Sequence, residues 1–134
     1  MEIIKGRTPG PSEDRTEGPT FTGRVWGDNI YTGEGVTANS VAFLPGGRTH
    51  WHHHEHGQLL IVTHGRGWVF NRDGEGAELT AGDMVWTPSG EDHWHGAASD
   101  SLLVHVAVSI GSTNWLEEVT RDEFDRLTSA AASL

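Results

Sequence analysis

Apolar and polar residues alternate in short stretches along this chain, and glycine or proline separates most of these stretches. A period of two is typical of β-strands that bury one face. The longest such stretch is 102–110, in which Leu103, His105, Ala107 and Ser109 share one face. We therefore expect strands, rather than helices, to make up most of the fold.

Shorter stretches of the same kind predict further strands. We expect them at 21–26, 36–44, 58–63, 68–71 and 84–87, and within 36–44 the residues Asn39, Val41 and Phe43 share one face. The sequence His64-Gly65-Arg66-Gly67 predicts a tight turn that pairs 58–63 with 68–71 as a hairpin. Many short strands broken by turns indicate an all-β antiparallel barrel or sandwich.

The two ends of the chain depart from this pattern. Residues 1–20 are expected to form an N-terminal arm, because 8–19 are polar and rich in Pro and Gly; a mobile tail and a segment draped over a neighbour both stay open. Near the other end, Thr120 and Glu123 predict a capping box, with Glu123 reaching back, and a short C-terminal helix to about Leu127. Residues 21–134 fit a single domain.

Composition narrows the classes of function. A formal net charge of −10 disfavours a nucleic-acid surface, and no stretch reaches the roughly 18–20 apolar residues of a membrane span. The N-terminus lacks the apolar run of a signal peptide, and the absence of cysteine excludes disulfides and thiolate metal ligands. We therefore expect a cytoplasmic protein without nucleic-acid or membrane partners.

Histidine is the residue type that most suggests chemistry. Five of the nine histidines lie within 50–56, and imidazole is the commonest metal ligand in proteins. His52 and His54 are two residues apart, so on a strand they point the same way. A second cluster, His93-Trp94-His95, follows the strand at 84–87. Two such clusters can meet inside a small barrel and complete a metal site.

The spacing around both clusters resembles that of the cupins. The first cupin motif, G-x5-H-x-H-x3/4-E-x6-G, is matched by Gly46, His52, His54, Gln58 and Gly65, with Gln58 in place of glutamate. The second, G-x5-P-x-G-x2-H-x3-N, is matched by Gly82, Pro88, Gly90, His93 and Ala97, with Ala97 in place of asparagine. The resemblance implies a double-stranded β-helix, or jelly-roll, barrel whose metal motifs lie at 46–65 and 82–97.

The resemblance also implies a set of metal ligands. These would be His52, His54, Gln58 and His93, which bind a divalent ion inside the barrel. Gln58 offers a neutral amide oxygen, so all four ligands would be uncharged and would leave the charge of the metal ion uncancelled. Such an ion is a stronger Lewis acid and attracts anions. Mn²⁺ is favoured, while Fe²⁺, Ni²⁺ and Zn²⁺ also suit these donors.

Within the cupins, the chain resembles the bacterial manganese-dependent hydroxynitrile lyases. The strings that carry this likeness are Trp51-His52-x-His54-x-x-Gly57-Gln58, Gly82-Asp83-x-Val85-Trp86 and His93-Trp94-His95-Gly96-Ala97, together with His105 in the last long strand. In that subgroup glutamine is the usual fourth ligand. The resemblance assigns His105 the general base that removes the substrate hydroxyl proton while cyanide leaves.

Other residues near these motifs receive weaker assignments. We expect Asn39, Val41, Ser109 and Trp94 to line the substrate pocket. His50, His53, His56 and His64 are expected to be exposed, and Glu55 is not expected to be a ligand. Strand alternation is taken to direct His95 away from His93, towards a supporting or surface position.

The resulting interpretation is a metal-dependent lyase of the hydroxynitrile type that acts on a small molecule. Two alternatives stay open: a cupin dioxygenase, decarboxylase or isomerase acting on a small oxygenated substrate, and a non-catalytic binder of a metal or small ligand. A fold alone does not choose among them. The resemblance also suggests a homodimer or higher homo-oligomer.

Overall fold

The computed structural model describes residues 1–6 and 9–132, so residues 7–8 of the predicted arm and residues 133–134 of the predicted domain lie outside it. The strands are β1 (Glu13–Asp14), β2 (Phe21–Thr22), β3 (Val25–Gly33), β4 (Val36–Phe43), β5 (Arg48–Thr49), β6 (His52–His54), β7 (Gln58–Asn71), β8 (Gly76–Thr80), β9 (Met84–Thr87), β10 (His93–Ala97), β11 (Leu103–Ile110) and β12 (Thr113–Trp115). A helix, α1 (Arg121–Ala132), follows them.

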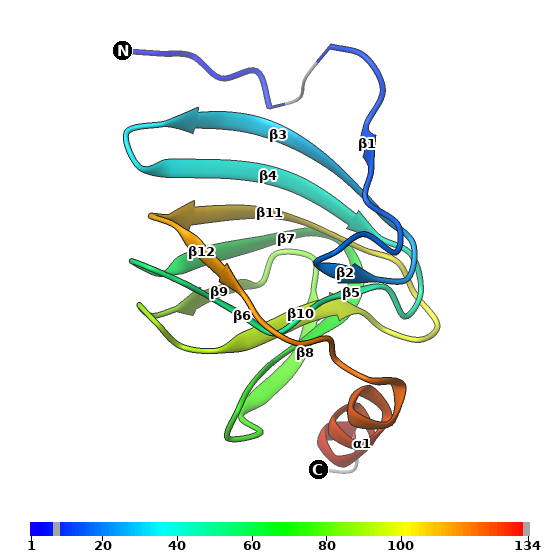
Figure 1. The fold of residues 1–134 in the computed structure, drawn as a ribbon. Coiled ribbons are helices and arrows are strands. Elements are labelled where there is room, and N and C mark those ends of the chain that lie inside the picture. Colours follow the sequence, from blue (N-terminus) through cyan, green and yellow to red (C-terminus); the bar gives the residue numbers. More distant parts are fainter. Residues whose placement is uncertain (7–8, 133–134) are drawn as a thin grey trace.

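The strands form one curled antiparallel sheet, which confirms the predicted all-β barrel (Figure 1). Its main path runs β1-β3-β4-β11-β7-β10-β5-β2. Strands β8 and β9 pair with β7, and β6 lies between β10 and β12. The curling brings the inner faces of the two halves of the sheet opposite each other, and the functional side chains lie between them.

β7 crosses from one half of the sheet to the other. Its first residues pair with β11 and β9, and its last residues pair with β10 and β8. The predicted hairpin at 64–67 is therefore wrong, because the strand bends there without reversing. Gly65 has a φ of 79°, and a Cβ at this position would collide with the carbonyl oxygen of Leu102. A bend at which two backbone segments approach this closely needs glycine, and so does a tight turn. The two therefore look alike in the sequence.

The N-terminal arm is partly built into the barrel. β1 pairs with β3, whereas β2 pairs with β5, so residues 13–22 connect the two halves of the sheet (Figure 1). The strand expected at 21–26 is accordingly divided between β2 and β3. The arm is thus positioned to contribute side chains to the interior.

A cluster of aromatic side chains packs between the outer face of the barrel and α1. Its buried members are Trp51, Trp68, Phe70, Trp94, Ala98, Val119 and Phe124. Arg48 is buried beside them, donates from Nε to the carbonyl oxygen of Val119, and places its guanidinium 5.1 Å from the ring centre of Phe124. Burial lowers the pKa of Arg48, since the charged form loses hydration there.

The helix begins as predicted, but its first turn is bonded differently. The Thr120 hydroxyl accepts a hydrogen bond of 3.2 Å from the backbone N–H of Glu123, as expected of an N-cap. The Glu123 carboxylate accepts from Trp51 Nε1 at 3.1 Å, so it fastens the helix to the residue before β6 and does not complete a capping box. Contacts of the helix with the barrel explain why it continues past Leu127.

A second apolar cluster lies inside the barrel. Its buried members are Val25, Val41, Phe43, Val62, Leu79, Ala97 and Leu103. Val41 and Phe43 come from the face of 36–44 that the sequence pattern assigned together, and Leu103 shares the inner face of β11 with His105. The residues predicted to share one face of each strand do so, and these faces lie inside the barrel.

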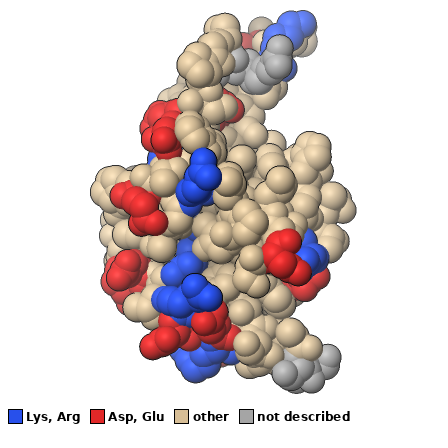
Figure 2. Space-filling view, turned by 90° about the vertical axis from the view of Figure 1, so that its right-hand side faces the viewer, with Lys and Arg blue, Asp and Glu red and all other residues tan. Residues whose placement is uncertain are grey.

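The surface carries charges of both signs. Figure 2 shows acidic and basic side chains next to one another on the face seen from the right of Figure 1. Across 1–6 and 9–132, no helix combines the length and apolar character needed to cross a membrane.

Removing the Phe124 ring should destabilise the protein without disturbing the interior. We expect Phe124→Ala to lower the free energy of unfolding by about 3–5 kcal/mol, because it empties a buried aromatic site on the outer face. Urea unfolding measures this change, with the exposed Leu116→Ala as a control that shifts stability by less than about 1 kcal/mol. Equal effects of the two substitutions would show that α1 contributes little to stability.

Candidate metal centre

Strands β6, β7 and β10 bring the two histidine clusters together. His52 of β6 pairs directly with His93 of β10, so their side chains leave the sheet on the same side. Their ring centres lie 4.3 Å apart, and both rings are buried. The neighbouring Trp51 and Trp94 point outward into the aromatic cluster under α1. Strand alternation thus places indoles on one side and imidazoles on the other.

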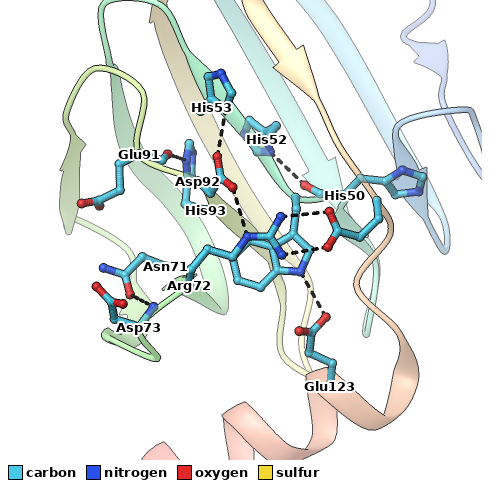
Figure 3. Close-up of polar contacts among 12 residues, drawn as sticks. His50, His52, His53, Asn71, Arg72, Asp73, Glu91, Asp92, His93 and Glu123 are labelled. Carbon is cyan, nitrogen blue, oxygen red and sulfur yellow. Dashed lines mark hydrogen bonds and ion pairs between the residues drawn. The ribbon is translucent and has the colours of Figure 1, made fainter.

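Each of the three predicted imidazole ligands is anchored through Nδ1. His52 Nδ1 lies 2.9 Å from the carbonyl oxygen of His50, and His93 Nδ1 lies 3.1 Å from that of Glu91 (Figure 3). His54 Nδ1 lies 3.0 Å from Thr113 Oγ1. A carbonyl oxygen can only accept, so Nδ1 of His52 and His93 carries the proton and Nε2 keeps its lone pair. This is the arrangement that supports metal-ligating histidines.

Gln58 and His93 direct two lone pairs at each other. The Gln58 amide donates from Nε2 to Ser109 Oγ at 3.0 Å, which turns its Oε1 towards His93 Nε2, also at 3.0 Å. With Nδ1 of His93 already donating to Glu91, neither of these facing atoms has a proton to share. A cation held between them would satisfy both acceptors.

Other ring nitrogens around this contact also lack partners. His54 Nε2 and His95 Nε2 are buried and have no hydrogen bond to any described residue. Ring nitrogens of His52, His93 and His95 lie within 4.8 Å of one another, a group that contains His95 and not the predicted ligand His54. Buried ring nitrogens without partners are costly unless a cation or water occupies the space between them. The imidazoles and Gln58 therefore fit a divalent metal ion.

Burial keeps these histidines uncharged. It lowers the pKa of His54 and of His93 to about 4, against the ordinary value of about 6.5, because an imidazolium would lose its hydration there. The pKa values of His52 and His95 lie well below the ordinary value, for the same reason and because other imidazoles surround them. Neutral imidazole is the form that binds a metal ion.

His95 and His105 form a hydrogen-bonded pair beside the cluster. His105 Nε2 lies 2.9 Å from His95 Nδ1, and both rings are buried. Burial lowers the pKa of His105 to about 4. The expected outward direction of His95 is wrong: residues 93 and 95 are two apart, so they share a face, and their rings stack with centres 5.6 Å apart. His95 thus lies between His105 and the cluster.

These groups border a cavity of about 120 Å³. Its lining residues are Arg15, Phe21, Thr37, Asn39, Val41, Phe43, Thr49, His52, His54, Gln58, His95, His105, Ala107, Ser109, Thr113 and Trp115. Pockets for drug-sized ligands typically measure about 300–1,000 Å³, so this cavity suits a small molecule.

The structure brings most of the predicted site residues to this cavity. Asn39, Val41 and Ser109 line it as expected. Trp94 does not, because it follows an inward-pointing histidine and packs outward against Phe70 and Phe124. Ser109 has a more definite place than pocket lining, since its hydroxyl fixes the Gln58 amide.

The remaining histidines of the first cluster lie outside the cavity. His56 is exposed, as predicted, and so is His64 farther along the chain, but His50 and His53 are only partly exposed. His53 Nδ1 lies 2.9 Å from Asp92 Oδ1. Asp92 also accepts from Arg72, whose guanidinium lies 4.0 Å from the Trp51 ring centre (Figure 3). This outer network joins β6 to the start of β10 and so supports the strands that carry His52 and His93. Glu55 is exposed and donates no ligand to the cluster.

Sequence reasoning did not single out the lining residues that come from β12, β2 and the arm. Thr113 and Trp115 belong to β12, a three-residue strand that follows a glycine and carries no alternation long enough to detect. Arg15 and Phe21 belong to the arm and its end, and only the pairing of β1 and β2 with the barrel brings them inside.

Comparisons with known proteins agree with this architecture. The family described as "Cupin domain" matches residues 39–109. An (R)-mandelonitrile lyase from Granulicella tundricola is 40% identical over 124 residues, which cover 86% of this chain and 95% of that protein. A cupin-like protein structure from Thermotoga maritima superposes with a TM-score of 0.77 at 38% identity, over 95% of this chain and 97% of that one.

A polyketide cyclase from Streptomyces resistomycificus has the same fold at lower identity. It superposes with a TM-score of 0.72 at 18% identity and covers 96% of this chain and 94% of its own. The match of residues 39–109, more than half of the 134 residues, and the close relative over most of the chain lead to one conclusion. This chain belongs to the cupin family.

Proposed function

We propose that this cupin is a metal-dependent lyase of the hydroxynitrile type, which cleaves a small cyanohydrin to a carbonyl compound and hydrogen cyanide. The observation that carries the proposal is the presence, in one small cavity, of a neutral donor cluster beside a buried imidazole pair. The relative described as an (R)-mandelonitrile lyase supports this choice of reaction.

The proposed ligands are His52, His54, Gln58 and His93. Their donors are uncharged, so a bound ion, for which we favour Mn²⁺, would act as a Lewis acid that polarises a substrate hydroxyl and lowers its pKa. His95 offers a further imidazole nitrogen on the cavity side of the cluster. Thr113 and Ser109 keep His54 and Gln58 in orientation through hydrogen bonds.

His105 and His95 would handle the proton. Both line the cavity and are uncharged, so the pair can accept the hydroxyl proton of a cyanohydrin and share it through their hydrogen bond. As the proton leaves, the O–H electron pair forms the carbonyl bond, and the bond to the nitrile carbon breaks with its electrons on cyanide. Return of the proton to cyanide gives hydrogen cyanide and restores the neutral pair.

Loss of one ligand should weaken metal binding strongly. We expect His54→Ala to raise the Kd for Mn²⁺ by more than about tenfold, because its unpartnered Nε2 faces the cluster. Calorimetric titration of metal-stripped protein measures the change. The exposed His64→Ala is the matched control and should bind Mn²⁺ like the wild type. Equal affinity in both variants would remove His54 from the ligand set.

Metal affinity should depend little on pH near neutrality. Since burial lowers the pKa of His54 and His93 to about 4, both remain neutral down to about pH 5 and protons compete weakly with the metal. We expect the Kd for Mn²⁺ to change by less than about threefold between pH 7.5 and 6, and to rise steeply only below about pH 5. A rise that begins near pH 6.5 would indicate imidazoles with ordinary pKa values.

Removing the proposed base should separate binding from turnover. His105→Ala is expected to keep its Mn²⁺ but to cleave mandelonitrile about 10²–10⁴-fold more slowly than the wild type, measured as benzaldehyde released. His64→Ala should remain as active as the wild type. Full activity in His105→Ala would exclude His105 from the mechanism, and no cleavage by the metal-loaded wild type would contradict the lyase proposal itself.

A further inference from the structure

Arg15 brings a positive charge from the N-terminal arm to the cavity. Its side chain is 19% exposed and belongs to the cavity lining, although it lies far in sequence from either metal motif. Its backbone N–H donates to the carbonyl oxygen of Val25, which fixes the arm against β3 beside the opening. The guanidinium is therefore held in place by the fold.

Side-chain contacts fix the orientation of this guanidinium. Arg15 Nη2 donates to Asn39 Oδ1 at 3.2 Å, and the plane of the group covers Gly27, where a Cβ would collide with it. Glu13 approaches Nε at 3.5 Å, but its side chain is 72% exposed, so this surface pair contributes little. No hydrogen bond to Arg15 Nη1 occurs among the residues that the structure describes.

Apart from the exposed Glu13 on its outer side, Arg15 faces no carboxylate in the cavity lining that the structure describes. None of the described residues that line the cavity is Asp or Glu, although the chain as a whole has a net charge of −10. The donors of the proposed metal centre are also uncharged, so a bound ion would add to the positive potential. A cavity of this kind favours an anion over a neutral ligand of the same size.

Arg15 stands where the cavity meets an outer groove. Arg15, Phe21 and Trp115 line both the cavity and a second hollow along the arm, of about 370 Å³. The carboxylates of Glu13 and Asp14 line this outer groove but not the inner cavity. A ligand that reaches the histidines from the groove must therefore pass the guanidinium.

We infer that the ligand of this cavity carries a carboxylate, which Arg15 binds at the mouth while a hydroxyl group of the same molecule points to the histidine cluster. Arg presents paired N–H donors that match a carboxylate, and Asn39 holds them in place. The ligand class is a small hydroxy acid or a cyanohydrin that bears a carboxylate. The placement of the ligand's hydroxyl group rests on the proposed function, whereas the binding of its carboxylate depends on Arg15 alone.

Two probes of equal size test the charge preference. Lactate carries a carboxylate where lactamide carries a neutral amide. Calorimetric titration gives the Kd of each probe with Mn²⁺-loaded and with metal-stripped protein. We expect the wild type to bind lactate about tenfold more tightly than lactamide, and to keep a preference of at least about threefold after the metal is removed. Equal Kd values for the two probes, or no lactate binding, would overturn the inference.

Substitution of Arg15 shows whether this residue causes the preference. In metal-stripped protein, Arg15→Gln should bind both probes equally, and Arg15→Lys should keep part of the preference because it keeps the charge. The exposed Arg24→Gln is the matched control and should behave like the wild type. A preference that survives in Arg15→Gln would overturn the assignment.

The outcome is independent of the lyase proposal. Cyanide release by the Mn²⁺-loaded wild type, from mandelonitrile or from a cyanohydrin that bears a carboxylate, tests the reaction, whereas lactate binding by metal-stripped protein tests Arg15 and needs no turnover. Carboxylate preference without cleavage would leave the Arg15 inference standing and refute the lyase reaction. Cleavage without carboxylate preference would support the lyase reaction and refute the Arg15 inference.

Discussion

Uncharged acceptors converge at the centre of this barrel, and the functional interpretation depends on that convergence. His93 Nε2 faces Gln58 Oε1 at 3.0 Å, while His54 Nε2 and His95 Nε2 lie buried without partners. Protonation would resolve the contact at low pH, but burial lowers the pKa of His93 to about 4. Near neutral pH, a divalent metal cation would satisfy several of these nitrogen and oxygen atoms at once.

The fold supplies this arrangement through strand alternation. Trp51 and Trp94 anchor the outer face under α1, and that packing obliges His52, His93 and His95 to point inward. The polar network of Arg72, Asp92 and Glu117 then joins the same strands at the surface. The apolar contacts that stabilise the helix thus also set the positions of the imidazoles.

Much of this could be predicted from local sequence. The residues that share a face in 36–44 and in 102–110 follow from a period of two, and the motif spacing selected His52, His54, Gln58 and His93, which lie near one another in the fold. The prediction of a hairpin at 64–67 was wrong, because contacts made only in the folded protein decide the path of the chain there. A glycine such as Gly65 occurs both in hairpin turns and in bends within one strand. The close approach of the Leu102 carbonyl oxygen, which identifies the bend, is visible only in the folded chain. The inward direction of His95, by contrast, could have been predicted, since His93 and His95 are two residues apart and therefore share a face of the strand.

The contribution of the arm could not be predicted from sequence. Two-residue strands such as β1 carry no periodicity, so the entry of Arg15 into the cavity depends on pairing that only the folded chain reveals. With Arg15 at the mouth and neutral donors within, an acidic protein encloses an electropositive cavity. The charge of the interior, opposite in sign to that of the whole molecule, determines which ligands the site favours.

An anomalous-scattering map from crystals of the Mn²⁺-loaded protein would locate the metal ion. We expect one strong peak inside the barrel, within bonding distance of Nε2 of His52, His54 and His93 and of Gln58 Oε1. A map with no peak there, or with manganese only at surface carboxylates, would refute the proposed metal centre.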